Sequence, residues 1–174
     1  MTMSFLINVR SLISFDEPTR HVEDELPLES LEYEHEAHAV AGPARVAVTL
    51  TRARNGILAE GTVVADVELT CSRCLGTYME HVEATFSETY ALAGHHLAAE
   101  GEEESVVSEE GDIDVEPLLL ESLVLAIPMK PLCSIECKGI CPICGADLNE
   151  GACGCTTESI DPRLEVLKKL KQSG

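Results

Sequence analysis

Tryptophan is absent from this chain of 174 residues, and aromatic residues account for only 3 % of it. The hydrophobic core must therefore be built from Val, Leu, Ile and Ala. No apolar run approaches the roughly 20 residues of a transmembrane helix, so we expect no membrane association. The N-terminus carries neither the basic segment nor the cleavage pattern of a signal peptide. These absences predict a cytoplasmic protein, in which thiols stay reduced.

Basic residues are also scarce. The chain has 12 Lys and Arg against 31 Asp and Glu, which gives a formal net charge of −19. Proteins that bind nucleic acids usually present a basic face, so this composition argues against a surface that embraces a phosphate backbone as a whole. Much of the excess lies in two acidic runs, at 16–36 and 100–116. Such runs are either solvated surface or a docking strip for a basic partner, such as a ribosomal protein.

What the chain does have is cysteine, in four close pairs. The pairs are spaced C-x2-C, C-x3-C, C-x2-C within the sequence CPICG, and C-x-C. A structural zinc ion takes four thiolate or imidazole ligands, usually as two short chelating pairs. The spacing therefore predicts two structural zinc ions. The eight candidate ligands are Cys71, Cys74, Cys133, Cys137, Cys141, Cys144, Cys153 and Cys155.

Spacing alone leaves two divisions of these ligands between the two ions open. We favour one site that closes a compact loop around CPICG, and a second site that pins the following segment to a strand turn. These sites are Cys141, Cys144, Cys153 and Cys155, and Cys71, Cys74, Cys133 and Cys137. A different division would use Cys137, Cys141, Cys144 and Cys153 for one site, and spacing alone does not decide between them.

Other uses of the cysteines are less well supported. Disulfides suit an even count but not a chain without an export signal. A thioredoxin-like redox role for Cys71 and Cys74 would place a helix after the pair, whereas a strand is expected there. An iron–sulfur cluster could use four of the thiolates, but the CPICG turn and the C-x-C pair favour zinc. With four cysteines per ion no position stays open for water, and no enzyme motif is present, so we predict no enzymatic activity and no small-molecule substrate.

Few basic side chains are placed to meet a partner. Arg73 lies between Cys71 and Cys74, where it could contact a phosphate or a partner carboxylate, or could offset the charge of a thiolate-rich zinc site. A small basic patch near the C-terminus is the other candidate contact with a partner or RNA. It contains Arg163, Lys168 and Lys169.

The hydrophobic pattern predicts a mainly β protein. Apolar residues alternate at 46–51, 57–69 and 77–90, and Asn55 followed by Gly56 is a strong hairpin signal between the first two strands. A further strand is expected at 4–13, whereas the acidic stretch 16–36 suggests a short irregular or helical piece. Helical spacing appears at 114–126 and again at 161–170, where Asp161 can cap the first turn.

These elements predict an α+β fold. A mostly antiparallel β-sheet or barrel-like core would carry one buried helix and a C-terminal cysteine-rich zinc module. The expected domains are a β-rich core at 1–130, with a mobile acidic loop at about 93–112, and a module at 131–174 that ends in a helix.

Several short motifs together resemble the YceD family, whose members are named large ribosomal RNA subunit accumulation proteins. They are FLINVR at 5–10, CSRCL at 71–75, IPMKPLC at 127–133, CKGICPICG at 137–145 and DPRL at 161–164. The resemblance implies a non-enzymatic role in the accumulation of large-subunit ribosomal RNA and in ribosome assembly. It supplies no catalytic residues.

Taken with the charge, this resemblance leads to the hypothesis of an acidic, zinc-stabilised adaptor. Its partner would be a basic ribosomal protein or assembly factor, through which ribosomal RNA is reached indirectly. The alternatives are a zinc protein that binds RNA directly and a thiol redox protein that uses Cys71 and Cys74.

Overall fold

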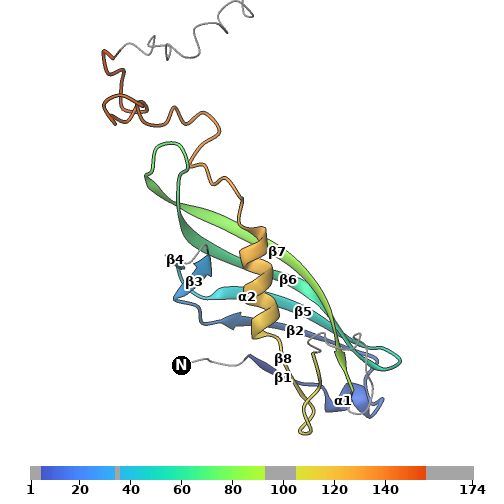
Figure 1. Cartoon of the computed structure of the whole chain (residues 1–174). Coiled ribbons are helices and arrows are strands. Elements are labelled where there is room, and N and C mark those ends of the chain that lie inside the picture. The colour runs from blue at the N-terminus through green and yellow to red at the C-terminus, as the bar shows by residue number, and fades with distance from the viewer. Residues whose placement is uncertain (1–4, 34–35, 93–104, 156–174) are drawn as a thin grey trace, which may run out of the picture.

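A computed structural model of the chain describes residues 5–33, 36–92 and 105–155. Its centre is a four-stranded antiparallel sheet in the order β2-β5-β6-β7, accompanied by the two-stranded pairs β1-β8 and β3-β4 (Figure 1). The elements are β1 Leu6–Asn8, α1 Arg10–Ile13, β2 Thr19–Leu26, β3 Ser30–Tyr33, β4 Glu36–Ala39, β5 Ala44–Arg52, β6 Gly56–Thr70, β7 Thr77–Ala91, β8 Asp112–Asp114 and α2 Glu116–Ala126.

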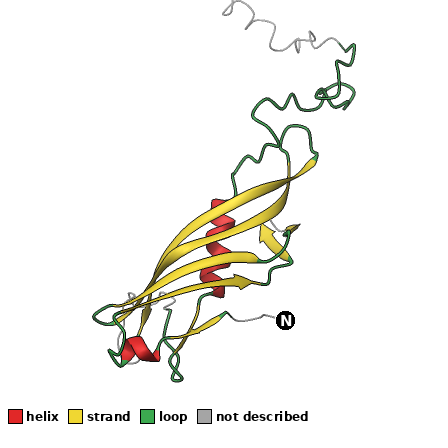
Figure 2. Ribbon diagram, turned by 180° about the vertical axis from the view of Figure 1, so that it is seen from behind, coloured by secondary structure: helices red, strands yellow, loops and turns green. Residues whose placement is uncertain are grey.

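The mostly antiparallel sheet expected from the sequence is present, but it does not form a barrel. Strands β2 and β7 are the two edges of the sheet, and within the described residues they do not pair with each other. Helix α2 covers one face of this sheet (Figures 1 and 2). The core therefore lies between an open sheet and one helix.

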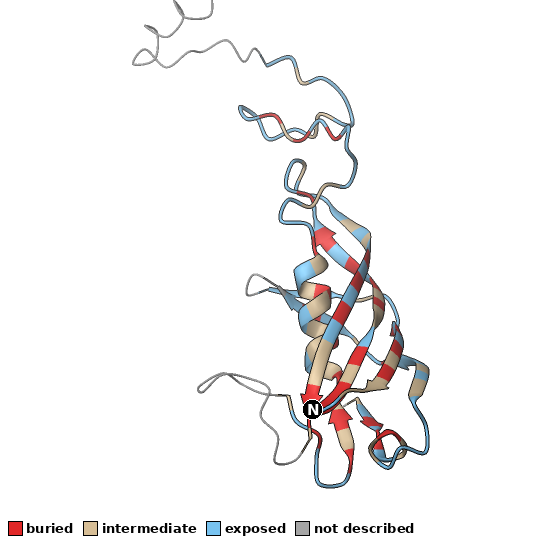
Figure 3. Ribbon diagram, turned by 90° about the vertical axis from the view of Figure 1, so that its right-hand side faces the viewer, coloured by how far each residue is buried: buried red, intermediate tan, exposed pale blue. Residues whose placement is uncertain are grey.

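The meander β5-β6-β7 follows directly from the residue pattern. Buried and exposed residues alternate along its strands (Figure 3), with Val46, Val48 and Leu50 of β5 buried. The predicted turn at Asn55 joins β5 to β6, where Arg52 pairs with Ile57. At Gly61 a Cβ atom would overlap the carbonyl oxygen of Ala47, so only glycine lets these two strands approach so closely.

The helix expected at 114–126 is α2. It has a proline in its first turn and lies against β6 and β7. Leu119 and Leu123 are fully buried on the sheet side, whereas Leu125 is 77 % exposed. None of the helices in the described part of the chain is both long and apolar enough to cross a membrane.

Two expectations for the N-terminal third are wrong. The stretch 4–13 contains the short strand β1 and the helical turn α1 in place of one long strand. The acidic stretch 16–36 contains strands β2 and β3 in place of an irregular or helical piece. Backbone pairing with β5 holds β2 as an edge strand, so its acidic side chains can stay in solvent while Leu26 is buried.

Two other expectations fall largely on residues that the structure does not describe. The helix expected at 161–170 lies outside the described residues, as does most of the loop expected at 93–112. The described end of that loop is attached to the fold: Val106 forms a bridge with Ala91, and Val107 is buried.

Candidate metal centres

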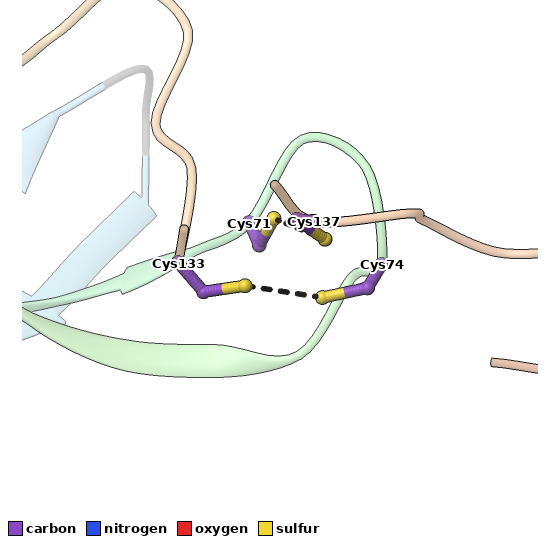
Figure 4. Close-up of side chains that lie close together, drawn as sticks. All are labelled: Cys71, Cys74, Cys133 and Cys137. Carbon is purple, nitrogen blue, oxygen red and sulfur yellow. Dashed lines mark hydrogen bonds between the residues drawn. The ribbon is translucent and has the colours of Figure 1, made fainter. Parts of the chain in front are cut away.

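The first cysteine group, Cys71, Cys74, Cys133 and Cys137, lies at the tip of the β6-β7 hairpin. Thr70 pairs with Thr77 at the end of the hairpin, so the turn between them presents Cys71 and Cys74 together. The chain that leaves α2 passes this tip (Figure 1) and brings the other two cysteines to it. Figure 4 shows the four sulfur atoms facing one another, with one contact from Cys71 to Cys137 and one from Cys74 to Cys133.

The sulfur positions of this group fit a tetrahedral ion. The Sγ atoms of Cys71 and Cys137 are 3.8 Å apart, those of Cys74 and Cys133 are 3.7 Å apart, and all four lie within 4.8 Å of one another. Zinc–sulfur bonds of about 2.3 Å in tetrahedral geometry place the sulfurs about 3.8 Å apart. The group could therefore hold one metal ion of this kind without a large rearrangement.

The second cysteine group, Cys141, Cys144, Cys153 and Cys155, lies further along the chain. Its ligand atoms also lie within 4.8 Å of one another. Cys141 is buried and Cys153 is half-buried, whereas Cys144 and Cys155 are exposed. The structure thus gathers the eight cysteines into the division that we favoured from spacing, and Cys137 does not join the second group.

Both groups are built on the same kind of C-x2-C turn. In the first turn the N–H of Arg73 donates to Cys71 Sγ at 3.4 Å, and the N–H of Leu75 donates to the Cys71 carbonyl at 2.9 Å. In the second turn Ile143 and Gly145 donate in the same way to the sulfur and carbonyl of Cys141, at 3.4 and 2.9 Å. Backbone N–H groups aimed at sulfur stabilise a thiolate, which is the form that binds metal.

These contacts give the thiols within each group different pKa values. Backbone N–H groups, first that of Cys74 and then that of Cys133, lower the pKa of Cys71 to about 6. The side chains of Cys137 and Cys71 raise the pKa of Cys133 to about 12. The Asn149 side chain, first among several causes, also lowers the pKa of Cys137. Cys71 and Cys137 thus ionise more readily than a free thiol, whereas Cys133 resists ionisation beside existing negative charge. A bound cation would remove that resistance, as expected for a metal site.

The second group repeats this pattern. The backbone N–H groups of Cys144 and Ile143 lower the pKa of Cys141 to about 6. The side chains of Cys144 and Cys153 raise the pKa of Cys155 to about 12.

Arg73 lies on the first turn as predicted, but its side chain faces the protein. One terminal nitrogen donates to the carbonyl oxygens of Ile135 and Cys137, at 3.0 and 2.9 Å. The guanidinium therefore fastens the segment between Cys133 and Cys137 to the hairpin, and that nitrogen is occupied. The other predicted contacts, Arg163, Lys168 and Lys169, lie outside the described residues.

Sequence reasoning missed Asn149, which contributes to the first group. Its Nδ2 atom lies 3.4 Å from Cys137 Sγ, and its Oδ1 atom accepts the N–H of Lys138 at 2.8 Å. A single asparagine in a loop gives no spacing signal. Its position among the cysteines, four residues before Cys153, was the one available hint.

The fold and the two groups define a β-rich protein with a cysteine-rich segment that could hold two metal ions. The family described as "Large ribosomal RNA subunit accumulation protein YceD" matches residues 59–171, which is more than half of the chain. The chain belongs to the YceD family, as its motifs suggested.

Similar proteins occur in bacteria and in a plant. An uncharacterized protein of Mycobacterium tuberculosis is 35 % identical over 118 residues, 66 % of this chain and 56 % of its own length. Bacillus subtilis YlbN, also uncharacterized, is 30 % identical over 110 residues, 63 % of each chain. The Arabidopsis thaliana protein named "Large ribosomal RNA subunit accumulation protein YCED homolog 1, chloroplastic" is 25 % identical over 164 residues, 75 % of this chain and 49 % of its own.

The chain spans between about half and under two thirds of the length of these relatives. No solved structure matches it.

Proposed function

We propose that this protein is a non-enzymatic factor that supports accumulation of large-subunit ribosomal RNA and assembly of the ribosome in the cytoplasm. The family description and the name of the Arabidopsis relative support the link to ribosomal RNA. We propose further that it acts as an acidic adaptor, whose partner is a basic ribosomal protein or a basic assembly factor. Ribosomal RNA would then be reached through that partner.

The observation that carries the adaptor proposal is the outer face of the four-stranded sheet, opposite α2 (Figure 2). Strand register and burial assign to it the side chains that alternate with the buried ones. The charged side chains that this register assigns to the face are one arginine, Arg45, and six carboxylates. These carboxylates belong to Glu23, Glu25, Glu60, Asp66, Glu68 and Glu83.

This outer face suits a basic protein better than RNA. Carboxylates repel phosphates, whereas they attract Lys and Arg side chains and accelerate encounter with a basic partner. The face also contains a shallow hollow, whose lining includes Glu23, Glu25, Arg45, Thr62 and Val64. Direct RNA binding stays the alternative, and it would depend on the basic residues after the second cysteine group.

We propose that the two cysteine groups each hold a structural zinc ion. The sulfur separations of the first group and the paired C-x2-C turns support this assignment. When bound, zinc would neutralise thiolate charge and cross-link the chain. The segment 131–174 would then be a zinc-stabilised module attached to a β-rich core at 1–130. A thiol redox role for Cys71 and Cys74 is the competing proposal, and it requires one of these thiols to be free and reactive.

The adaptor proposal can be tested by placing the same change of charge once on the outer face and once elsewhere. The variant Glu60→Lys/Glu68→Lys/Glu83→Lys alters the outer face, and the formal net charge changes from −19 by 3 × 2 to −13. Binding to purified basic large-subunit ribosomal proteins would be measured by biolayer interferometry at two salt concentrations. We expect at least a tenfold loss of affinity, roughly 1.4 kcal/mol.

The matched control carries the same charge change elsewhere. Glu109→Lys/Glu110→Lys/Glu121→Lys replaces exposed glutamates of a loop and of α2, and we expect it to bind as the unmodified chain does. Equal loss in both variants would mean that net charge alone matters. Tight binding of naked ribosomal RNA with steep salt dependence, and no binding to the proteins, would replace the adaptor with the direct RNA alternative.

A further inference from the structure

Side-chain and backbone hydrogen bonds connect the two cysteine groups. Asn149 belongs to the loop between Cys144 and Cys153, which the second group closes. Its side-chain amide nevertheless reaches the first group, where Nδ2 lies 3.4 Å from Cys137 Sγ. The same amide accepts the N–H of Lys138, next to Cys137, at 2.8 Å. Both ends of one side chain from the second loop thus hold a ligand segment of the first group.

The backbone makes a parallel connection. The N–H of Ile140 donates to the Arg73 carbonyl of the first turn at 3.1 Å, and Leu148 donates to the Gly139 carbonyl at 2.9 Å. Gly139 is buried with φ of 74°, and a Cβ atom there would lie 2.9 Å from the Arg73 carbonyl oxygen. Residues 138–140 are therefore fitted between the hairpin tip and the loop that carries Asn149.

This loop has little hydrophobic core of its own. From 142 to 152 every residue is exposed except Asp147 and Leu148, which are half-buried. A loop with so few buried contacts is ordered mainly by its hydrogen bonds and by the cross-link that a metal in the second group would supply. Without that cross-link, Asn149 would be held less firmly against Cys137. N–H donors to ligand atoms commonly change metal affinity by about 10- to 100-fold.

We propose that the two metal centres are coupled, with Asn149 as the positioning residue that transmits the effect. Metal in the second group fixes the loop, and the Asn149 amide then stabilises the Cys137 thiolate and raises the affinity of the first group. Linkage requires that metal in the first group raise the affinity of the second by the same factor. This inference rests on the proposal that both groups bind zinc.

The test follows each group separately in the full-length chain. Zinc-loaded protein is equilibrated in chelator buffers that set a series of free zinc concentrations. A short pulse of an alkylating reagent follows, and mass spectrometry of peptides measures the alkylated fraction of each cysteine. The readout is the free zinc concentration at which Cys71 and Cys74 become half-alkylated. Circular dichroism monitors the sheet, whose hydrophobic core includes no cysteine of the second group.

Variants of the second group and of Asn149 isolate the coupling. Cys144→Ser/Cys155→Ser disables the second group, and we expect the first-group midpoint to rise about tenfold in free zinc. Asn149→Ala should produce a similar rise, and combining it with the double serine variant should add little. Asn149→Asp keeps the acceptor for Lys138 but turns a carboxylate oxygen toward the thiolate. This variant should therefore raise the first-group midpoint more than Asn149→Ala does. The exposed neighbour variant Glu150→Ala should leave the midpoint unchanged.

The outcomes separate this inference from the zinc proposal. An unchanged first-group midpoint in the double serine variant and in Asn149→Ala would overturn the coupling and leave two independent zinc sites. A rise of the same size for Asn149→Ala with and without the second group would also overturn it, because Asn149 would then act on the first group alone. Rapid alkylation of all eight thiols at every zinc concentration would instead reject zinc binding itself.

Discussion

Leu75 and Gly145 occupy the same position in two similar turns, and both have a left-handed backbone, with φ of 60° and 73°. Each follows the second cysteine of a C-x2-C pair and donates its N–H to the carbonyl of the first. Glycine adopts this conformation freely, whereas a residue with a Cβ atom is strained by roughly 1 kcal/mol or more. The first turn thus has an exposed leucine in a strained conformation, whereas the second turn has a glycine, which adopts that conformation without strain.

The first prediction concerns Gly145. Gly145→Ala should lower the zinc affinity of the second group by about fivefold, because a left-handed alanine costs roughly 1 kcal/mol. The matched control is Gly151→Ala, since neither glycine has a neighbour within 4 Å of the added Cβ but only Gly145 has a positive φ. Chelator competition measures both. Equal affinity for the two variants would show that the turn relaxes without cost.

The second prediction concerns the Arg73 side chain. Arg73→Ala removes the donor to the carbonyl oxygens of Ile135 and Cys137, so the segment 133–137 should exchange its amide hydrogens faster. The expected loss of local stability is about 1 kcal/mol, because the side chain is exposed and such bonds are partly replaced by water. Arg54→Ala, an exposed arginine in the β5-β6 turn, is the control and should leave exchange in that segment unchanged.

The third prediction concerns removal of metal. Chelation should release the segment 131–155 while the sheet and α2 stay folded, because the core residues between them do not include the cysteines. Hydrogen exchange should therefore rise at 131–155 and at the hairpin tip, with protection kept at Val48 and Leu119. Loss of protection throughout the sheet on chelation would mean that the centres stabilise the whole fold.

The fourth prediction concerns a buried hydroxyl that links β7 to the strand before α2. Tyr90 is buried, and its phenol donates to the Asp114 carbonyl at 3.0 Å; burial raises its pKa, so the donor stays protonated. Tyr90→Phe leaves that carbonyl without its donor and should cost about 1 kcal/mol in urea unfolding. Ser87→Ala, which removes an exposed hydroxyl from the same strand, should change stability by less than about 0.5 kcal/mol.

The parts of the fold that could be predicted are those where burial decides the residue pattern. Val46, Val48 and Leu50 alternate cleanly because one face of β5 packs in the core, and the turn at Asn55 sets the hairpin. β2 was missed because it is an edge strand with Glu23, Asp24 and Glu25 in succession, so alternation is hidden. Its pairing with β5 is a tertiary effect that no local pattern records.

The candidate site, like the fold, was predictable from the sequence only in part. The cysteine groups could be anticipated because a metal needs ligands in chelating pairs, and such pairs leave a spacing in the sequence. The contacts of Arg73 and Asn149 could not, since they join residues 62 to 64 and 12 positions apart through the folded backbone. The expected role of Arg73, contact with a partner or compensation of thiolate charge, stays a prediction beside its contacts to carbonyl oxygens within the chain.

The length of the β6-β7 hairpin has a consequence for how many molecules this protein can engage. Each strand has 15 residues, and at about 3.3 Å per residue the hairpin spans up to roughly 50 Å. A globular domain of about 100 residues has a radius of gyration of about 13 Å, so it cannot touch both ends. A domain of that size bound near Asn55 would therefore leave the cysteine end of the hairpin accessible to a second molecule.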